Sequence, residues 1–161
     1  MEIRAATADD IVGIAPFFRA IVADGESYTY PDDLTDEQIA EAWLAPEPGH
    51  TIVAVEDGVI VGTARMGPNK PGRGDHVGTA SFMVDPGSSA RGVGRAMARW
   101  MIDWHRENGY RAIQFNAVVE TNVRAVALWQ DLGFRIIGTV PKAYRSRTHG
   151  LVGLHIMYLE L

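Results

Sequence analysis

Apolar residues recur along the chain with two different spacings, and the change from one to the other predicts an alternation of helices and strands. A spacing of three to four residues is typical of one face of a helix, whereas alternation and short apolar runs are typical of strands. Helical spacing falls near residues 11–21, 35–43, 93–107 and 122–132. Strand patterns fall at residues 2–5, 51–56, 59–66, 76–84, 112–119, 134–140 and 153–161. The resulting order, β-α-α-β-β-β-α-β-α-β-β, predicts a mixed α/β fold.

Capping and turn residues stand at the expected ends of several elements. Thr7 and Thr35 precede helical patterns, where a hydroxyl can accept a hydrogen bond from a first-turn N–H. Asp57-Gly58 separates two strand patterns and predicts a tight hairpin. No repeat or linker-like tract interrupts the 161 residues, so we expect residues 1–161 to form a single domain.

The stretch from residue 82 to residue 95, which reads FMVDPGSSARGVGR, carries the clearest functional signal. An apolar strand pattern ends at Val84, a loop of small residues follows, and the G-V-G triplet at residues 92–94 opens a helical pattern. The first N–H groups of a helix lack intrahelical partners and attract anions, and glycine lets the backbone approach a phosphate closely. We therefore expect a phosphorylated cofactor here. Taken alone, paired glycines at a helix start are equally typical of a helix cap or a close-packing site.

Two familiar phosphate-binding motifs do not match this stretch. The chain contains no G-x-x-x-x-G-K-[ST] string, which argues against a nucleotide-hydrolysing P-loop. A dinucleotide-binding fold carries its glycines in the first strand–helix unit, whereas here they follow several expected strands. The glycines at residues 92–94 therefore indicate another kind of cofactor site.

Two motifs together resemble those of the GNAT acetyltransferase superfamily. The first runs from Val84 through the loop to residues 91–97, RGVGRAM, and is similar to the acetyl-CoA loop V-x-P-x-x-R/Q-G-x-G-x-G/A. The second, at residues 122–134, reads NVRAVALWQDLGF and is similar to N-x-x-A-x-x-L-Y-x-x-x-G-F. The resemblance extends from about residue 2 to the C-terminus and is most specific over residues 80–140. Because both motifs occur in the expected order and at the expected distance, the chain is identified as a member of this superfamily.

The resemblance implies a GNAT fold, in which a central, mostly antiparallel, twisted sheet of about seven strands is flanked by about four helices. It also implies that the strands at residues 78–84 and 112–119 splay apart and leave a wedge for acetyl-CoA. Backbone groups of the first strand would pair with the pantetheine arm, and a strand N–H near Met83 would polarise the thioester carbonyl. The N–H groups of residues 89–95 would hold the pyrophosphate. The residues expected to bind the cofactor are Phe82, Met83, Val84, Ser89, Ala90, Arg91, Gly92, Val93, Gly94, Arg95 and Asn122.

The chain departs from the family pattern at two positions. Ser89 stands where the family has its first arginine or glutamine, so Arg91 and Arg95 are left to face phosphate charge. Trp129 stands where the family has a tyrosine that often protonates the departing thiolate. An indole N–H is not an acid of useful pKa, so that role does not carry over to Trp129.

Transfer to an amine needs a group that accepts the proton of the amine. On a regular strand, one face carries Gln114, Asn116, Val118 and Glu120. Glu120 ends this strand beside the expected wedge and is the first candidate for the general base. The alternative is a solvated carboxylate near a helix N-terminus, where the helix dipole favours a negative charge.

Other polar and aromatic residues receive candidate roles. Tyr144 falls in the loop expected between the last two strands and could replace the missing acid. The resemblance places Tyr28 and Tyr30 on a loop that covers the acceptor site, where they would contact substrate or form an apolar lid. It places Asn122 near the cofactor, and a plain N-cap is the alternative for this residue.

Composition narrows the classes of function. Apolar residues make up 47% and charged residues 22%, which is typical of a globular protein. We expect a cytoplasmic protein without a membrane segment, because there is neither a charged-then-apolar leader nor a run of about 18 apolar residues. The absence of cysteine excludes disulfides and thiolate chemistry, and a net charge of −5 argues against nucleic acid. The five histidines lack metal-ligand spacing, so no metal is expected.

Together these observations predict an N-acetyltransferase that moves an acetyl group from acetyl-CoA directly to a primary amine of a small molecule or peptide. Direct transfer is favoured because neither a cysteine nor an activated Ser-His pair is apparent. One alternative is a non-catalytic acyl-CoA-binding sensor or regulatory module, which the tryptophan at position 129 in place of the family tyrosine favours. Another is a protein-interaction domain that has lost the cofactor. The acceptor would depend on the loops at residues 24–34, 67–76 and 141–151, and an exposed final strand would permit a homodimer.

Overall fold

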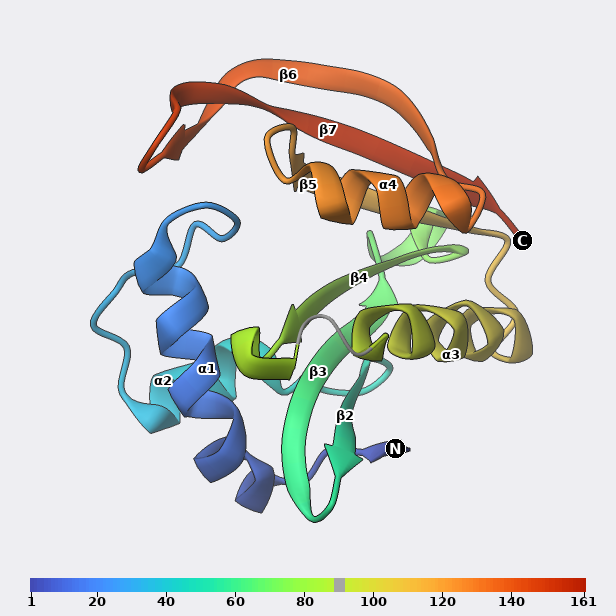
Figure 1. Cartoon of the computed structure of the whole chain (residues 1–161). Coiled ribbons are helices and arrows are strands. Elements are labelled where there is room, and N and C mark those ends of the chain that lie inside the picture. The colour runs from blue at the N-terminus through green and yellow to red at the C-terminus, as the bar shows by residue number, and fades with distance from the viewer. Residues whose placement is uncertain (89–91) are drawn as a thin grey trace.

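Seven strands and four helices make up the part of the chain that the computed structural model describes, residues 1–88 and 92–161 (Figure 1). The strands are β1 (Glu2–Ala5), β2 (His50–Glu56), β3 (Val59–Pro68), β4 (Val77–Val84), β5 (Ala112–Val119), β6 (Arg135–Ser146) and β7 (Gly150–Glu160). The helices are α1 (Ile11–Asp24), α2 (Asp36–Trp43), α3 (Val93–Glu107) and α4 (Val123–Asp131). Short 3-10 turns are Ala8–Asp10, Gly72–Gly74 and Pro86–Ser88. The predicted order of elements is confirmed, and none of the helices in these residues is long and apolar enough to cross a membrane.

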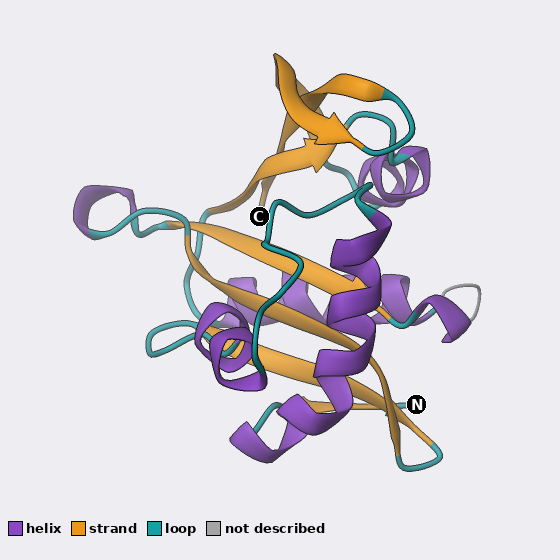
Figure 2. Ribbon diagram, turned by 90° about the vertical axis from the view of Figure 1, so that its left-hand side faces the viewer, coloured by secondary structure: helices purple, strands orange, loops and turns teal. Residues whose placement is uncertain are grey.

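The strands form one mixed sheet in the order β1-β2-β3-β4-β5-β7-β6, and all neighbours are antiparallel except β4 and β5. β3 and β4 stay in register over seven residue pairs, whereas β4 and β5 pair only at Val77–Ala112 and Gly78–Ile113. Beyond these two pairs β4 and β5 diverge, and Figure 2 shows the sheet as two groups of strands. The predicted mixed sheet with a splayed central pair of strands is confirmed.

Helices cover both faces of the sheet, and an apolar core lies beneath each pair of helices. On one face α3 and α4 pack over a cluster that includes Met97, Ile113 and Trp129. On the other face α1, blue in Figure 1, and α2, cyan, pack over a cluster that includes Phe18 and Trp43. Full burial of one large apolar side chain stabilises the fold by about 1.5–3 kcal/mol relative to exposure. Burial on both faces explains why the central strands read as nearly continuous apolar runs.

Local hydrogen bonds explain where several elements begin. The Thr35 hydroxyl accepts from the Gln38 N–H at 3.3 Å, and the Gln38 side chain accepts from the Thr35 N–H at 2.9 Å, so α2 begins with a capping box. Thr7 precedes the first 3-10 turn and not α1 itself. Asp57 and Gly58 have φ angles of 51° and 79°, which suit the two-residue hairpin that joins β2 to β3.

The connection between the last two strands is shorter than the sequence predicted, because β6 continues to Ser146. Pro141 suggested a break, but a proline without an N–H is tolerated on an edge strand, and β6 is the edge of this sheet. A bulge just before Tyr144, where Lys142 has a φ of 54°, accommodates the irregular backbone. The placement of Tyr144 in a loop is therefore wrong, since Tyr144 lies within β6.

His105 is a buried polar side chain that joins α3 to the first residues of β4. Its side chain is fully buried, and its Nδ1 donates to the Met101 carbonyl oxygen at 2.8 Å. A Cβ added at Gly78 would lie 2.2 Å from the ring carbon Cδ2 of His105, so this position of β4 requires glycine. Burial lowers the pKa of His105, and the ring is neutral in the folded protein.

We expect the free energy of unfolding to fall as the medium becomes acidic. Because folding lowers the pKa of His105, the unfolded chain binds the proton more tightly and stability is lost as the pH drops below about 6.5. One such group gives a slope of at most about 1.4 kcal/mol per pH unit. Urea unfolding at a series of pH values between roughly 8 and 5 measures this slope.

The substitution His105→Gln should flatten the slope, since it removes the titrating ring. His76→Gln, at an exposed position, is the matched control and should leave the slope as it is. Equal slopes in the His105→Gln variant and the wild-type protein would contradict the assignment.

Candidate functional site

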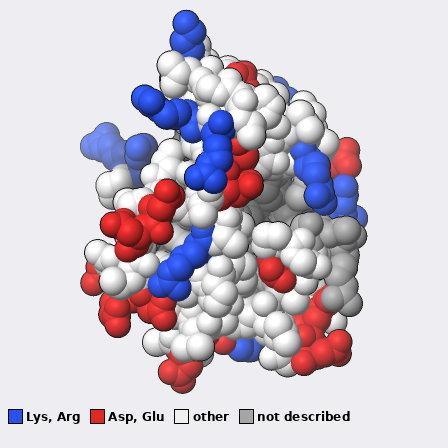
Figure 3. Space-filling model, turned by 60° about the vertical axis from the view of Figure 1, so that its left-hand side comes forward, with Lys and Arg blue, Asp and Glu red and all other residues white. Residues whose placement is uncertain are grey.

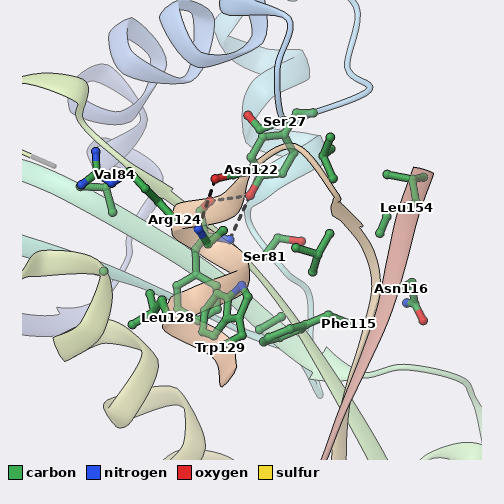
Figure 4. Close-up of a pocket in the computed structure, with 18 of the residues that line it drawn as sticks. Ser27, Ser81, Val84, Phe115, Asn116, Asn122, Arg124, Leu128, Trp129 and Leu154 are labelled. Atoms are coloured by element: carbon green, nitrogen blue, oxygen red, sulfur yellow. Dashed lines mark hydrogen bonds between the residues drawn. The ribbon is translucent and has the colours of Figure 1, made fainter. Parts of the chain in front are cut away.

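A cleft of about 790 Å³ opens where β4 and β5 diverge. It is lined by these two strands, by the first turns of α3 and α4, and by the loop between α1 and α2 (Figure 4). In the space-filling view the molecule is hollowed on this side, with side chains of both charge signs around the hollow (Figure 3). The predicted site residues that line the cleft are Tyr28, Tyr30, Phe82, Val84, Gly92, Gly94, Arg95, Asn122 and Tyr144.

The backbone of β4 presents an open edge to the cleft. The Phe82 N–H donates to the Tyr28 hydroxyl at 3.0 Å, and that hydroxyl donates to the Phe82 carbonyl oxygen. Because hydrogen-bonding direction alternates along an antiparallel strand, Val84 faces the cleft as Phe82 does, whereas Met83 faces β3. The N–H that we expected near Met83 is therefore that of Val84, since the Phe82 N–H is bonded to Tyr28. The Met83 side chain is buried beneath α1 and α2 with 1% exposure.

α3 begins at the wall of the cleft with the glycines that the sequence singled out. Gly92 is the N-cap and has a φ of 81°, the left-handed region that favours glycine. Gly94 lines the cleft, and a Cβ there would lie 3.6 Å from Cγ2 of Val84, an ordinary contact. Val93 is fully buried in the core, so only its backbone can serve the site. The positive end of the helix dipole at this wall favours an anion.

Of the arginines expected to face phosphate, Arg95 lines the cleft and forms an ion pair with Asp131 of α4 at 2.8 Å. The side chains of Arg95 and Asp131 are exposed to 42% and 63%, so the pair is open to solvent and contributes little to stability. It links the start of α3 to the end of α4. Ser89, Ala90 and Arg91, which were also expected to hold the cofactor, lie outside the described residues.

Asn122 combines a structural position with a place in the cleft. Its side-chain oxygen accepts from the Ala125 N–H at 3.2 Å, which makes it the N-cap of α4. The same residue lines the cleft beside Ser27 (Figure 4). The N-cap is therefore confirmed, and a contact between Asn122 and the cofactor stays a prediction.

Trp129 forms part of an aromatic wall. Its ring lies 5.0 Å from the ring of Phe82 and 4.6 Å from that of Phe115, centre to centre. Only 7% of the residue is exposed, although it borders the cleft (Figure 4). The larger indole thus packs against both diverging strands, which gives Trp129 a structural task in place of the acid role of the family tyrosine.

Hydrogen bonds tie the loop between α1 and α2 to the hairpin of β6 and β7. The Glu26 carboxylate accepts from the Ser146 hydroxyl at 2.5 Å and from the Thr148 N–H at 2.9 Å. The Arg147 N–H donates to the Gly25 carbonyl oxygen at 3.1 Å. The bond from Ser146 is the main cause that lowers the pKa of Glu26. Two segments far apart in the sequence are therefore fixed together over the cleft.

Three tyrosines meet at this junction. The Tyr144 hydroxyl donates to the Tyr28 carbonyl oxygen at 3.2 Å, and the rings of Tyr28 and Tyr30 stack with centres 5.9 Å apart. Burial raises the pKa of Tyr28 and of Tyr144, so both phenols stay protonated near neutral pH. The roles of Tyr144 as an acid and of Tyr28 and Tyr30 as substrate contacts stay predictions.

Glu120 does not line the cleft. A bulge in β5 between Phe115 and Val118 adds one residue to the strand and shifts the alternation of its side chains. Glu120 therefore lies on the opposite face from Gln114, and the shared face expected for a regular strand is wrong. The Glu120 carboxylate accepts from the Gly153 N–H on β7, a contact that supports the strand pairing. Its role as the base stays a prediction.

Among the described residues that line the cleft, none carries a carboxylate or an imidazole. A second hollow of about 450 Å³ adjoins on the α1 side and shares Ser27, Phe82 and Val84 with the cleft. Asp24, in the last turn of α1, is the one ionisable side chain in the described lining of this hollow. The two hollows thus meet over the open edge of β4. The described parts of the chain hold no group of three or more histidine, aspartate or glutamate side chains placed to bind a metal ion.

A family model described as the acetyltransferase (GNAT) family matches residues 15–134. The chain belongs to the GNAT acetyltransferase family. A GCN5-related N-acetyltransferase from Kribbella flavida is 55% identical to it, with a TM-score of 0.96, and the match covers 99% of this chain and 97% of that one.

Two less similar proteins match the chain over different lengths. N-acetyltransferase aca1 from Schizosaccharomyces pombe is 32% identical over 98 residues, which cover 60% of this chain and 47% of that protein. The chain therefore matches about half the length of this relative. A phosphinothricin acetyltransferase from Sinorhizobium meliloti, solved in complex with acetyl-CoA, has a TM-score of 0.87 at 20% identity, covering 99% of this chain and 88% of that one. At this identity the likeness shows the GNAT fold alone.

Several residues of this GNAT site were missed from the sequence. Ser27 and Asn116 reach the cleft through a loop and a strand bulge, and neither carries a local signal. Arg124 also lines the cleft. It lies two positions after Asn122 in the second motif, so the sequence could have predicted its place in the first turn of α4. Asp24, at the end of α1, also carries no local signal that marks it as a residue of the second hollow.

Removal of the Glu26 carboxylate should loosen the loop that borders the cleft. In Glu26→Ala the Ser146 hydroxyl and the Thr148 N–H lose their acceptor, so we expect faster hydrogen–deuterium exchange at the loop amides around Ser27. Glu41→Ala, at an exposed position of α2, is the control and should leave this exchange unchanged. Identical exchange in both variants would show that the carboxylate does not hold the loop.

Proposed function

We propose that this GNAT family member transfers an acetyl group from acetyl-CoA to a primary amine of a small molecule or peptide. The cleft between β4 and β5 carries the proposal, because it joins the open backbone edge of β4 to the glycine-bearing N-terminus of α3. A strand edge suits the amide-bearing pantetheine arm, and a helix N-terminus suits a pyrophosphate. The likeness to an N-acetyltransferase that is 55% identical supports the same activity.

The described residues fit acetyl-CoA in charge and in shape. The backbone of Val84 faces the cleft, and its carbonyl oxygen would accept a hydrogen bond from the pantetheine arm, whereas both backbone groups of Phe82 are bonded to the Tyr28 hydroxyl. Gly94 adds no side chain to the wall at the start of α3, and Arg95 and Arg124 supply positive charge beside it. Trp129 closes the apolar wall on the other side.

Bound acetyl-CoA would supply its acetyl group as a thioester, so that transfer forms an N–C bond, breaks the C–S bond and moves one proton from nitrogen to sulfur. The N–H of Val84 lies on the open part of the strand edge, where it would donate to the carbonyl oxygen as negative charge develops. The hydroxyl that we propose to deliver a proton to the sulfur is that of Tyr144, which lines the cleft. Trp129 cannot perform this step, because an indole N–H is too weak an acid.

The second hollow is the entry that we propose for the acceptor. Asp24 would attract the ammonium form of the amine and accept its proton, while Ala20, Ile21 and Pro86 offer an apolar lining. Because this hollow meets the cleft over β4, the amine would approach the thioester from the side opposite the pantetheine arm of acetyl-CoA. A primary amine with an apolar portion is the substrate class that this lining favours.

The homodimer and the cytoplasmic location expected from the sequence stay predictions. The expectation that the final strand is the exposed edge is wrong, because β7 lies between β5 and β6 in the sheet. The edge strand is β6, which exposes Ile137 to 56% and Val140 to 46% and so gives a second copy an apolar surface to cover. An open strand edge also offers backbone groups for pairing.

Acetyl-CoA should raise the thermal unfolding temperature. A ligand that binds only the folded state at about 100 times its Kd adds roughly 2.7 kcal/mol of stability. Gly94→Asp should abolish this shift, because the carboxylate would repel phosphate while the space and the helix dipole tolerate it. Gly94→Ala is the matched neutral variant and should keep most of the shift. The measurement is a thermal unfolding scan with and without acetyl-CoA.

Three outcomes separate the functions considered. A shift together with thiol release on addition of an amine from a panel supports the enzyme. A shift without thiol release against any amine favours the non-catalytic sensor, for which the tryptophan at position 129 is the motivating feature. The lack of a shift at millimolar acetyl-CoA would favour the protein-interaction domain.

The two candidate bases are separable by substitution. If Asp24 accepts the amine proton, Asp24→Asn lowers kcat/KM for the amine by roughly 100-fold while the thermal shift with acetyl-CoA persists. Glu120→Gln, which keeps an acceptor for the Gly153 N–H, should leave the pH profile of kcat unchanged. The reverse result, in which only Glu120→Gln slows transfer, would restore Glu120 as the base and overturn the role of Asp24.

A further inference from the structure

Tyr28 connects the two groups of strands that diverge at the cleft. Its carbonyl oxygen accepts from Tyr144 on β6 at 3.2 Å, and its hydroxyl oxygen accepts from the Phe82 N–H on β4 at 3.0 Å. The hydroxyl also donates to the Phe82 carbonyl oxygen, so both backbone groups of Phe82 are engaged by one phenol. Tyr28 therefore links β4 to β6 through hydrogen bonds.

The ring of Tyr28 is held on two further sides. It stacks on Tyr30 at 5.9 Å with an interplanar angle of 20°, and it meets Trp43 edge to face at 6.0 Å with an angle of 76°. Trp43 is itself fully buried and donates from its Nε1 to the Thr63 hydroxyl at 2.9 Å. A ring packed in this way cannot turn aside without disturbing the core beneath α2.

The position of Tyr28 along β4 sets the length of strand edge open to a ligand. Gly94 and the start of α3 lie beside Val84, so a ligand held at the helix N-terminus reaches Val84 first. Phe82 lies two residues farther, about 6.6 Å along the strand. The backbone edge open for pairing therefore ends at the phenol of Tyr28, and Thr79, Ala80 and Ser81 line the cleft beyond it.

We infer that Tyr28 closes the acyl compartment and restricts the enzyme to acetyl-CoA among the acyl-CoA thioesters. The inference rests on the proposed function, since it concerns the acyl donor bound in the same cleft. A two-carbon acyl group fits before the phenol, whereas each additional methylene meets a ring that is fixed on three sides. In pockets of this kind one methylene in excess changes discrimination by roughly 10- to 200-fold.

The test compares the binding of free CoA, acetyl-CoA, butyryl-CoA and hexanoyl-CoA to the wild-type protein by titration calorimetry. Binding is measured without an amine, so the result does not depend on the identity of the acceptor. We expect similar affinities for free CoA and acetyl-CoA, and at least about tenfold weaker binding of butyryl-CoA and hexanoyl-CoA.

Two variants separate the ring of Tyr28 from its hydroxyl. Tyr28→Ala removes the ring and should bring hexanoyl-CoA to within about threefold of acetyl-CoA, whereas Tyr28→Phe keeps the ring and should keep the discrimination. If Tyr28→Ala fails to fold, Tyr28→Leu retains apolar packing against Trp43 but ends short of Phe82, and it should show the same gain.

The outcomes distinguish this inference from the proposed function. Equal affinity of the wild-type protein for acetyl-CoA and hexanoyl-CoA would overturn the role of Tyr28 and leave the cofactor site intact. Unchanged discrimination in a folded Tyr28→Ala or Tyr28→Leu variant would do the same. A lack of binding for every CoA species, free CoA included, would overturn the cofactor site and the inference with it.

Discussion

Backbone hydrogen bonding where β4 and β5 part is the constraint on which the rest of the structure depends. Parallel strands that pair over two residues and then separate leave a row of N–H and C=O groups without strand partners. Buried backbone groups without partners are strongly unfavourable, so the fold has to satisfy them or keep them accessible to a ligand. At Phe82 a phenol supplies both bonds, and at Val84 the edge opens into the cleft.

Gly78 and the buried imidazole of His105 lie at the point where β4 and β5 begin to diverge. Gly78 pairs with β5 at the last register point, and the absence of a side chain there lets His105 of α3 lie directly against β4. α3 is thereby fixed at its C-terminal end, while its N-terminal glycines stand at the wall of the cleft. α3 therefore lies against β4 both at Gly78, where β4 and β5 are still paired, and at Val84, where the two strands have separated.

Local signals predicted most of the fold and some of the residues that line the cleft. Capping residues, the Asp57-Gly58 turn and the glycines at residues 92–94 act within a few positions, so the starts of helices, that of α3 included, could be predicted from the sequence. Tyr144, Glu120 and Met83 were misplaced because strand bulges and the direction of strand pairing depend on distant partners. Pro141 on the edge strand β6 suggested a loop. One extra residue in the bulge of β5 places the Glu120 side chain on the face opposite to the expected one.

The ties between the loop after α1 and the hairpin of β6 and β7 join residues 116 to 122 positions apart. Contacts of such sequence separation form slowly, since a long chain segment must be ordered before they are made. During synthesis β4 exists before the hairpin that completes the cleft, and its edge remains open over that interval. Strand edges of this kind recruit other chains, so the cleft region is the part of the nascent chain most exposed to misassembly.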